Sequence, residues 1–352
     1  MPPVLPRPSA RSFAQRLADG VMIGAEGYVF ELERRGYVKA GPYVPEVILD
    51  APDALRQLHR EFLRAGADVM VALTYYAHRE KLRDVGRGDD LELMNRQAVR
   101  IANEIAAEGA AAGGGALVAG NICNTWCYDP ANPVTSGAEV REQYREQLGW
   151  AADEGVDFVI SETNDFLGEA MIGLEVCHEL GLPAMVTLAS VRPDTTYDEV
   201  DYVEACRRLA DAGAAVVGLN CSRGPATMLP LLERIRAAVD VPVAAQPVPY
   251  RTDTATPAFE SLTGADGERL FPIQLEASGH TRFEMADFAR KAREIGVDYV
   301  GICCGGSPHH VRAMAEALGR ATPASRYSPA LDLHPVLGTS DNEVMGDWSA
   351  TA

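Results

Sequence analysis

The stretch PDALRQLHREFLRAGADVMVALTYY (52–76) places a helical pattern, a glycine and a buried strand in immediate succession. Its first part carries an apolar stripe from Leu55 to Leu63, which predicts an amphipathic helix that ends at Gly66. A continuous apolar run, DVMVALTYY (68–76), follows at once and is typical of a parallel strand buried on both faces. This order of helix, glycine turn and strand favours a parallel α/β protein.

The same succession recurs along the chain, in AGADVM (65–70), EGVDFV (154–159), AGAAVV (212–217) and IGVDYV (295–300). Eight apolar runs are expected to form strands: 21–23, 68–76, 116–122, 157–161, 184–188, 215–220, 241–246 and 298–304. Amphipathic patterns between them predict eight helices, which is the content of a TIM (β/α)8 barrel. A doubly wound sheet is the alternative, but no glycine-rich phosphate loop follows the first strand.

We therefore expect a single α/β domain, with the barrel spanning residues 19–320. Residues 1–18 are interpreted as an N-terminal extension, and the Pro- and Ser-rich residues 321–352 as a short C-terminal arm or tail. Two segments depart from the repeat. Residues 77–90 are predicted to be a charged loop, and residues 247–282 a long insertion rich in Pro, Thr and Gly.

Composition excludes several classes of function. The 352 residues include 50 acidic and 32 basic ones, a formal net charge of −18, which argues against a nucleic-acid partner and an anionic membrane surface. No secretory signal and no apolar run long enough to span a membrane is visible. The chain has seven cysteines, an odd number, which favours free thiols over a disulfide framework. Free thiols in turn favour a cytoplasmic location.

Three of these cysteines follow predicted strand ends. Cys221 lies in GLNCSRGP (218–225), whereas Cys303 and Cys304 lie in GICCGGSP (301–308). These strand ends are near neighbours at the functional face of a barrel, so the three thiols are expected to converge. Three thiolates with a vacant fourth position are typical of catalytic Zn²⁺, and the glycines after Cys304 allow both adjacent sulfurs to face one ion.

The remaining cysteines are interpreted as packing residues. Cys177 and Cys206 fall in the middle of predicted helices, where a buried thiol behaves as a small apolar side chain. Cys123 and Cys127 form a C-x3-C pattern after the third strand, for which packing is favoured and occasional metal binding is the alternative.

A thiolate-bound zinc with an open position is suited to activating another thiol, because the metal lowers the pKa of that thiol. The resulting thiolate can take a methyl group from an onium donor, whose positive charge favours aromatic faces and carboxylates. Candidates are Tyr75 and Tyr76 at the end of the second strand, Glu26 after the first, Glu162 at the end of the fourth, and Tyr43 in AGPYVPE (40–46). The alternatives are that these tyrosines only shape a pocket and that Glu162 is a cap or a solvated acid.

Long collinear segments of the chain resemble the homocysteine S-methyltransferase family, and within it the betaine-dependent enzymes. They are FELERRGYVKAGPYVPE (30–46), QLHREFLRAGADVM (57–70), TYYAHREKL (74–82), GLNC (218–221), GICCG (301–305) and HHVRAMAEAL (309–318). The resemblance implies a TIM barrel and a zinc ion held by Cys221, Cys303 and Cys304. It implies that Glu162 binds the amino group of homocysteine.

The resemblance also assigns the donor side of the site. It places Tyr76 near the quaternary nitrogen of the donor and Tyr43 where the family has a tryptophan, and Asn220 joins the predicted substrate-binding residues. Ala25-Glu26-Gly27 stands where the family has Asp-Gly-Gly, so Glu26 is the candidate for the missing carboxylate. Thr163 replaces a tyrosine of the betaine enzymes.

The expected activity is zinc-dependent methyl transfer from a small onium compound to homocysteine, giving methionine. Betaine is the first candidate donor, and S-methylmethionine or a dimethylsulfonio acid is the alternative. A homo-oligomer is possible. A zinc lyase or hydrolase is disfavoured because no histidine follows a predicted strand as a base. A zinc or thiol sensor without turnover is the non-enzymatic alternative.

Overall fold

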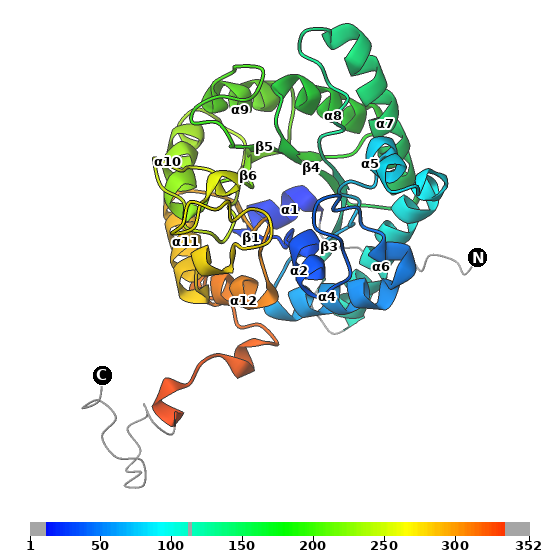
Figure 1. Ribbon diagram of the computed structural model, residues 1–352. Helices are drawn as coiled ribbons and strands as arrows, with labels where there is room; N and C mark the ends of the chain where they lie inside the picture. Colours follow the sequence, from blue (N-terminus) through cyan, green and yellow to red (C-terminus); the bar gives the residue numbers. More distant parts are fainter. Residues whose placement is uncertain (1–11, 112–114, 335–352) are drawn as a thin grey trace.

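The computed structural model describes residues 12–111 and 115–334. Within them, eight parallel strands form one sheet in the order β1-β8-β7-β6-β5-β4-β3-β2, and Figure 1 shows the ring of helices around it. Between the first and last strands of that order, the Asp68 N–H donates to the Ile23 carbonyl over 2.7 Å. The predicted TIM barrel is confirmed.

The strands are buried and mostly short. They are β1 Met22–Ile23, β2 Val69–Val71, β3 Leu117–Ile122, β4 Phe158–Asn164, β5 Ala184–Ala189, β6 Val216–Asn220, β7 Val243–Gln246 and β8 Tyr299–Val300. Six lie within the predicted apolar runs, whereas β4 and β5 extend past them. The runs overestimate β2 and β8, because their last residues leave the sheet and form the loops above it. Cys303 and Cys304 therefore lie in the loop after β8.

Eight helices cover the outside of the barrel, as expected. They are α4 Pro52–Ala65, α6 Leu91–Ala111, α7 Pro133–Asp153, α8 Leu167–Glu179, α9 Tyr202–Asp211, α10 Pro225–Arg236, α11 Arg282–Ile295 and α12 Pro308–Ala317. The described residues also form four short helices, α1 Phe13–Ala18, α2 Tyr28–Arg34, α3 Val47–Asp50 and α5 Arg79–Asp84. The expectation of a plain loop at 77–90 is wrong, since α5 and a 3₁₀ turn occupy most of it.

Glycines end the helices before strands, as predicted. Gly66 caps α4 at φ 106°, and its N–H donates to the carbonyls of Phe62 and Leu63. Gly296 caps α11 in the same left-handed conformation, at φ 90°. Gly155 and Gly213 follow the caps of α7 and α9, also with positive φ. An L-residue is strained in this region, which explains the glycine before four of the strands.

The N-terminal end of the barrel is closed by side chains from both ends of the described chain. In Figure 1, α1 lies across the centre of the ring, and its Phe13 stacks on Phe158 with ring centroids 3.8 Å apart. Asp68 pairs with Arg16 (2.6 Å) and Arg320 (2.5 Å). Access to the interior is therefore from the opposite end, where the strands finish.

Beyond α12, the described chain projects away from the barrel up to residue 334 (Figure 1). Residues 335–352 of the predicted tail (321–352) lie outside the described residues, as do residues 1–11 of the predicted N-terminal extension (1–18). None of the helices in the described part of the chain combines the length and the apolar composition needed to span a membrane.

Candidate active site

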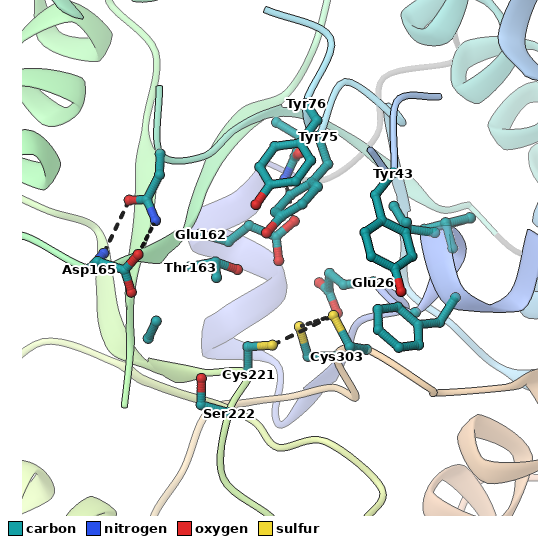
Figure 2. A pocket seen from close by; sticks show the side chains of 18 of the residues that line it. Glu26, Tyr43, Tyr75, Tyr76, Glu162, Thr163, Asp165, Cys221, Ser222 and Cys303 are labelled. Atoms are coloured by element: carbon teal, nitrogen blue, oxygen red, sulfur yellow. Dashed lines mark hydrogen bonds between the residues drawn. The ribbon is translucent and has the colours of Figure 1, made fainter. Parts of the chain in front are cut away.

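A cavity of about 340 Å³ opens at the carboxyl ends of the strands, and Figure 2 shows many of its lining side chains. Nearly all the residues singled out in the sequence line it. They are Glu26, Tyr43, Tyr75, Tyr76, Glu162, Cys221, Cys303 and Cys304. The exception is Asn220, which is fully buried and is not among the described lining residues.

The three cysteine sulfurs form a compact triangle. Cys221 Sγ lies 3.6 Å from Cys304 Sγ, which lies 3.9 Å from Cys303 Sγ, and all three are within 4.8 Å of one another. In a tetrahedral site with Zn–S bonds of about 2.3 Å, neighbouring sulfurs are roughly 3.8 Å apart. The thiols are free, and their spacing exceeds the bond of about 2 Å in a disulfide. The donor set and its spacing therefore fit one zinc ion.

The backbone at the triangle is held by its neighbours. Cys221 adopts φ 57° directly after β6, and its N–H donates to the Gln246 carbonyl over 3.0 Å. The Cys303 N–H donates to the Pro247 carbonyl over 2.9 Å. Gly305 has φ 90°, and a Cβ there would lie 2.3 Å from the hydroxyl oxygen of Tyr250. Only glycine fits this turn, which brings Cys303 and Cys304 to the same side.

A β-bulge at the end of β4 sets the direction of Glu162. Ser161 pairs with Val186 and Asn164 with Leu188, so β4 contains one extra residue between these pairs. Thr163 takes φ 55°, a rare conformation for a β-branched residue.

Asn220 holds this bulge. Its Oδ1 accepts from the Thr163 N–H over 2.8 Å, and its Nδ2 donates to Thr163 Oγ1 (2.8 Å) and Glu162 Oε2 (3.2 Å). Asn220 Nδ2 also lies 3.6 Å from Cys303 Sγ. Asn220 therefore lies behind the cavity wall and connects the Glu162 carboxylate to the sulfur triangle.

Two buried carboxyl groups face the centre of the cavity. Tyr299 donates to Glu26 Oε1 over 2.8 Å, while Glu26 Oε2 is buried without a partner in the described chain. Asn121 donates to Glu162 Oε1 over 2.6 Å. Burial raises the pKa of Glu26 to about 7, and burial together with the charge of Glu26 raises the pKa of Glu162 to about 8.

Two further acids line the cavity and were not predicted from the sequence. Asn124 donates to Asp165 Oδ2 over 2.6 Å, and Ser222 donates to Glu260 Oε1 over 2.9 Å. Burial raises the pKa of Asp165 to about 7, with smaller contributions from Glu169 and Glu260. Asp165 could have been noted in SETND (161–165), three residues after Glu162. Glu260 gave no signal, because it lies in the insertion, whose path the sequence does not predict.

Aromatic rings line the side of the cavity formed by the loops after β1, β2 and β3. The Tyr75 and Tyr76 ring centroids are 4.4 Å apart, and Trp126 lies 6.4 Å from Tyr76. Tyr43 stacks on Phe30 at 5.2 Å. Trp126, Phe30, Tyr197, Phe259 and Phe271 also line the cavity and were not singled out in the sequence.

Strained backbone is concentrated in this cavity. Seven described residues other than glycine have positive φ, and six of them line it. They are Tyr43, Tyr76, Trp126, Thr163, Cys221 and Ser222. Such conformations persist where the surrounding structure enforces them, and they are frequent at functional sites. None of the described lining residues is Lys, Arg or His, so the cavity combines acids and aromatic faces without a basic side chain.

The other cysteines lie outside this cavity. Cys177 on α8 and Cys206 on α9 are buried in the apolar core, which confirms their packing role. Cys123 is buried, whereas half-buried Cys127 has its sulfur within 4.8 Å of carboxylate oxygens of Glu80 and Glu139. Gln143 Nε2 also donates to Cys127 Sγ over 3.2 Å.

The family model for homocysteine S-methyltransferase matches residues 23–318, which include the last residue of β1, strands β2 to β8 and the sulfur triangle. The chain belongs to the homocysteine S-methyltransferase family. Betaine–homocysteine S-methyltransferase 1 of Xenopus tropicalis is 39% identical over 324 residues, covering 89% of this chain and 77% of that relative. The protein is therefore a methyltransferase.

A second sequence relative and a solved structure are also similar to this chain, and the structure supports the fold alone. S-methylmethionine–homocysteine S-methyltransferase BHMT2 of Pongo abelii is 36% identical, covering 92% of this chain and 88% of that relative. A crystal structure of the homocysteine methyltransferase MmuM from Escherichia coli, in its oxidized form, superposes with a TM-score of 0.67. It covers 86% of this chain and 98% of MmuM at 18% identity, and it supports the fold alone.

Proposed function

We propose that this protein is a zinc-dependent S-methyltransferase that moves a methyl group from a small onium donor to homocysteine, forming methionine. The observation that carries the proposal is the sulfur triangle of Cys221, Cys303 and Cys304 in a cavity of aromatic rings and carboxyl groups. Zinc bound by three thiolates keeps one position open and makes a thiol bound there more acidic. Because the site needs reduced thiols, we propose that the protein acts in the cytoplasm.

In this proposal, Glu162 and Glu26 bind the amino group of homocysteine. Both carboxyl groups are nearly fully buried, and Glu26 Oε2 lacks a partner in the described chain. An ammonium group between them would favour their ionised forms, because opposite charges lower the pKa of a carboxyl group. Asn121 and Asn220 donate to Glu162 and fix its direction.

Tyr43, Tyr75 and Tyr76 stabilise the cationic donor. A desolvated cation–π contact is worth about 2 kcal/mol, and holding the methyl carbon in line with the acceptor sulfur provides much of the rate gain. Transfer breaks the bond from the methyl carbon to the onium atom and forms a bond to sulfur. Transfer neutralises the positive charge of the onium donor and the negative charge of the homocysteine thiolate. No proton transfer is therefore required at this step. Betaine is the donor favoured by the sequence, with a dimethylsulfonium compound as the alternative.

Cys304→Ala tests the metal site, because it removes one of three ligands from a position that is only partly buried. We expect metal analysis of the reduced variant to show loss of zinc and methyl-transfer assays to show loss of methionine formation. The matched control is Cys206→Ala, which removes a core thiol on α9 and should keep zinc. Full activity in a zinc-free Cys304→Ala protein would contradict the proposal. So would wild-type protein that binds zinc and homocysteine but forms no methionine from any onium compound.

A further inference from the structure

Two acidic side chains of the cavity, Asp165 and Glu260, have no role in the function proposed above. Asp165 follows β4, and Figure 2 shows it on the side opposite Tyr43. Glu260 belongs to the 3₁₀ turn Phe259–Ser261 in the insertion after β7. Both line the cavity, and the charge of Glu260 is one of the causes that raise the pKa of Asp165.

Each of these acids offers an oxygen that no described residue satisfies. Asp165 is only 8% exposed, and Asn124 holds its Oδ2, while no hydrogen bond from the described chain reaches Oδ1. Glu260 Oε1 accepts from Ser222, whereas its Oε2 is buried without a partner in the described chain. The donors that fix them are neutral, and the described lining contains no basic side chain that could pair with either carboxyl group.

The surroundings of this acidic pair favour a cation. Tyr197 lines the cavity beside Asp165, and its backbone N–H donates to the Asp165 carbonyl over 2.8 Å. Arg192 stacks on the Tyr197 ring at 4.8 Å, but it is exposed and is not among the described lining residues. A buried carboxylate is costly unless it is paired, and a bound ligand with N–H donors would pair both acids.

We propose that Asp165 and Glu260 bind a primary ammonium group of the methyl donor, which makes the preferred donor an onium amino acid such as S-methylmethionine. The inference rests on the proposed function, which assigns the ammonium of homocysteine to Glu162 and Glu26. A quaternary ammonium has no N–H, so betaine could not satisfy the free oxygens of Asp165 and Glu260. A sulfonium amino acid provides a methyl source that the tyrosine rings can hold and three N–H donors for Asp165 and Glu260.

The test compares two donors that differ only in the amino group, S-methylmethionine and 4-(dimethylsulfonio)butanoate. In the zinc-loaded wild type, we expect kcat/KM to favour S-methylmethionine at least about tenfold, because hydrogen bonds to charged groups are strong. Asp165→Asn and Glu260→Gln should each reduce this preference to about threefold or less, by lowering kcat/KM for S-methylmethionine. KM for homocysteine should not change. The control Asp194→Asn removes an exposed acid outside the described lining and should keep the preference.

Several outcomes would overturn the assignment. Equal use of the two donors by the wild type would do so, as would an unchanged preference in folded Asp165→Asn and Glu260→Gln proteins. A higher KM for homocysteine with both donors would show that the pair binds the acceptor. If Asp165→Asn fails to fold in a thermal unfolding assay, Glu260→Gln decides, since its side chain keeps an oxygen to accept from Ser222. Absence of methionine with every onium donor would contradict the proposed function itself, and the inference with it.

Discussion

Glu162 shows how much of this site depends on the residue next to it. The left-handed conformation of Thr163 costs about 1–3 kcal/mol, and the two hydrogen bonds to Asn220 hold it in place. The same Asn220 amide donates to Glu162, so strain in one residue orients the carboxylate of another. The sequence indicated Glu162 and Asn220 as site residues. It did not indicate that Asn220 lies behind the cavity wall, because a bulge at a threonine has no sequence signature.

Glu162→Gln should raise KM for homocysteine about tenfold or more, with a smaller effect on kcat. The amide keeps the size of the side chain but removes the charge that would pair with the acceptor ammonium. Initial rates at varied homocysteine, with the donor saturating, measure this effect. Glu154→Gln is the matched control, because Glu154 is equally buried but binds Arg96 and Arg100 instead of lining the cavity. Unchanged dependence on homocysteine in Glu162→Gln would remove its assigned role.

At the scale of elements, the succession of helix, glycine and strand carries most of the fold. Apolar runs located all eight strands because buried parallel strands need apolar side chains on both faces. The same runs overestimated β2 and β8, since pocket-lining residues such as Tyr75 and Cys303 are also apolar. Helix α5 (Arg79–Asp84) was not predicted, because its residues are mostly charged and show no apolar periodicity. It is a short helix among surface ion pairs.

Gly66→Ala and Gly155→Ala should separate backbone strain from close packing in these turns. Both glycines have positive φ, so each alanine should cost about 1–2 kcal/mol of unfolding free energy. At Gly66 a Cβ would also lie 2.6 Å from Thr322 Cγ2 and 3.1 Å from Ala315 Cβ, whereas at Gly155 it would meet open space. We expect a further loss of about 1 kcal/mol or more in Gly66→Ala, measured by urea unfolding. Equal losses would show that the neighbours of Gly66 move aside freely.

The candidate site was predictable where its residues follow strands, and it was not where they lie in insertions. Cys221, Cys303 and Cys304 follow β6 and β8, and barrel topology alone brings such positions together. Glu260 reaches the same cavity from the insertion after β7, where the sequence does not predict its position, and it accepts a hydrogen bond from Ser222 there. Loop conformation depends on many weak contacts that leave no periodic pattern.

For the molecule as a whole, buried titratable groups give stability two opposing dependences on pH. Burial lowers the pKa of His59 to about 3, so the stability that it contributes is full above pH 6.5 and falls as pH decreases. Burial raises the pKa of Glu26, Glu162 and Asp165 to about 7 or 8. Their contribution is greatest below about pH 4 and declines as pH rises towards those values. Between pH 5.5 and 7.5 the two effects partly cancel.

His59→Phe should therefore remove the contribution of His59 to the pH dependence of stability and leave that of the buried carboxyl groups. On going from pH 7.5 to 5.5, the wild type should lose about 1 kcal/mol more unfolding free energy than the variant does, because its unfolded state binds one more proton. The loss of the hydrogen bond between the Tyr28 hydroxyl and His59 Nδ1 (3.1 Å) lowers stability at both pH values and cancels in the comparison. His178→Gln, at an exposed position, is the control. Urea unfolding at fixed zinc content tests this prediction, and identical pH responses of wild type and His59→Phe would refute it.

The ion pairs at Asp68 have a practical consequence for anyone who handles this protein. Arg16 and Arg320 meet on this one carboxylate at the base of the barrel, so the chain enters and leaves the barrel at the face remote from the substrate entrance. An affinity handle, a fluorescent reporter or a tether to a solid support can be joined before α1 or after residue 334 without obstructing that entrance. Because Arg16 and Arg320 lie this close together, a barrel bounded by these two residues is a suitable starting point for circular permutation.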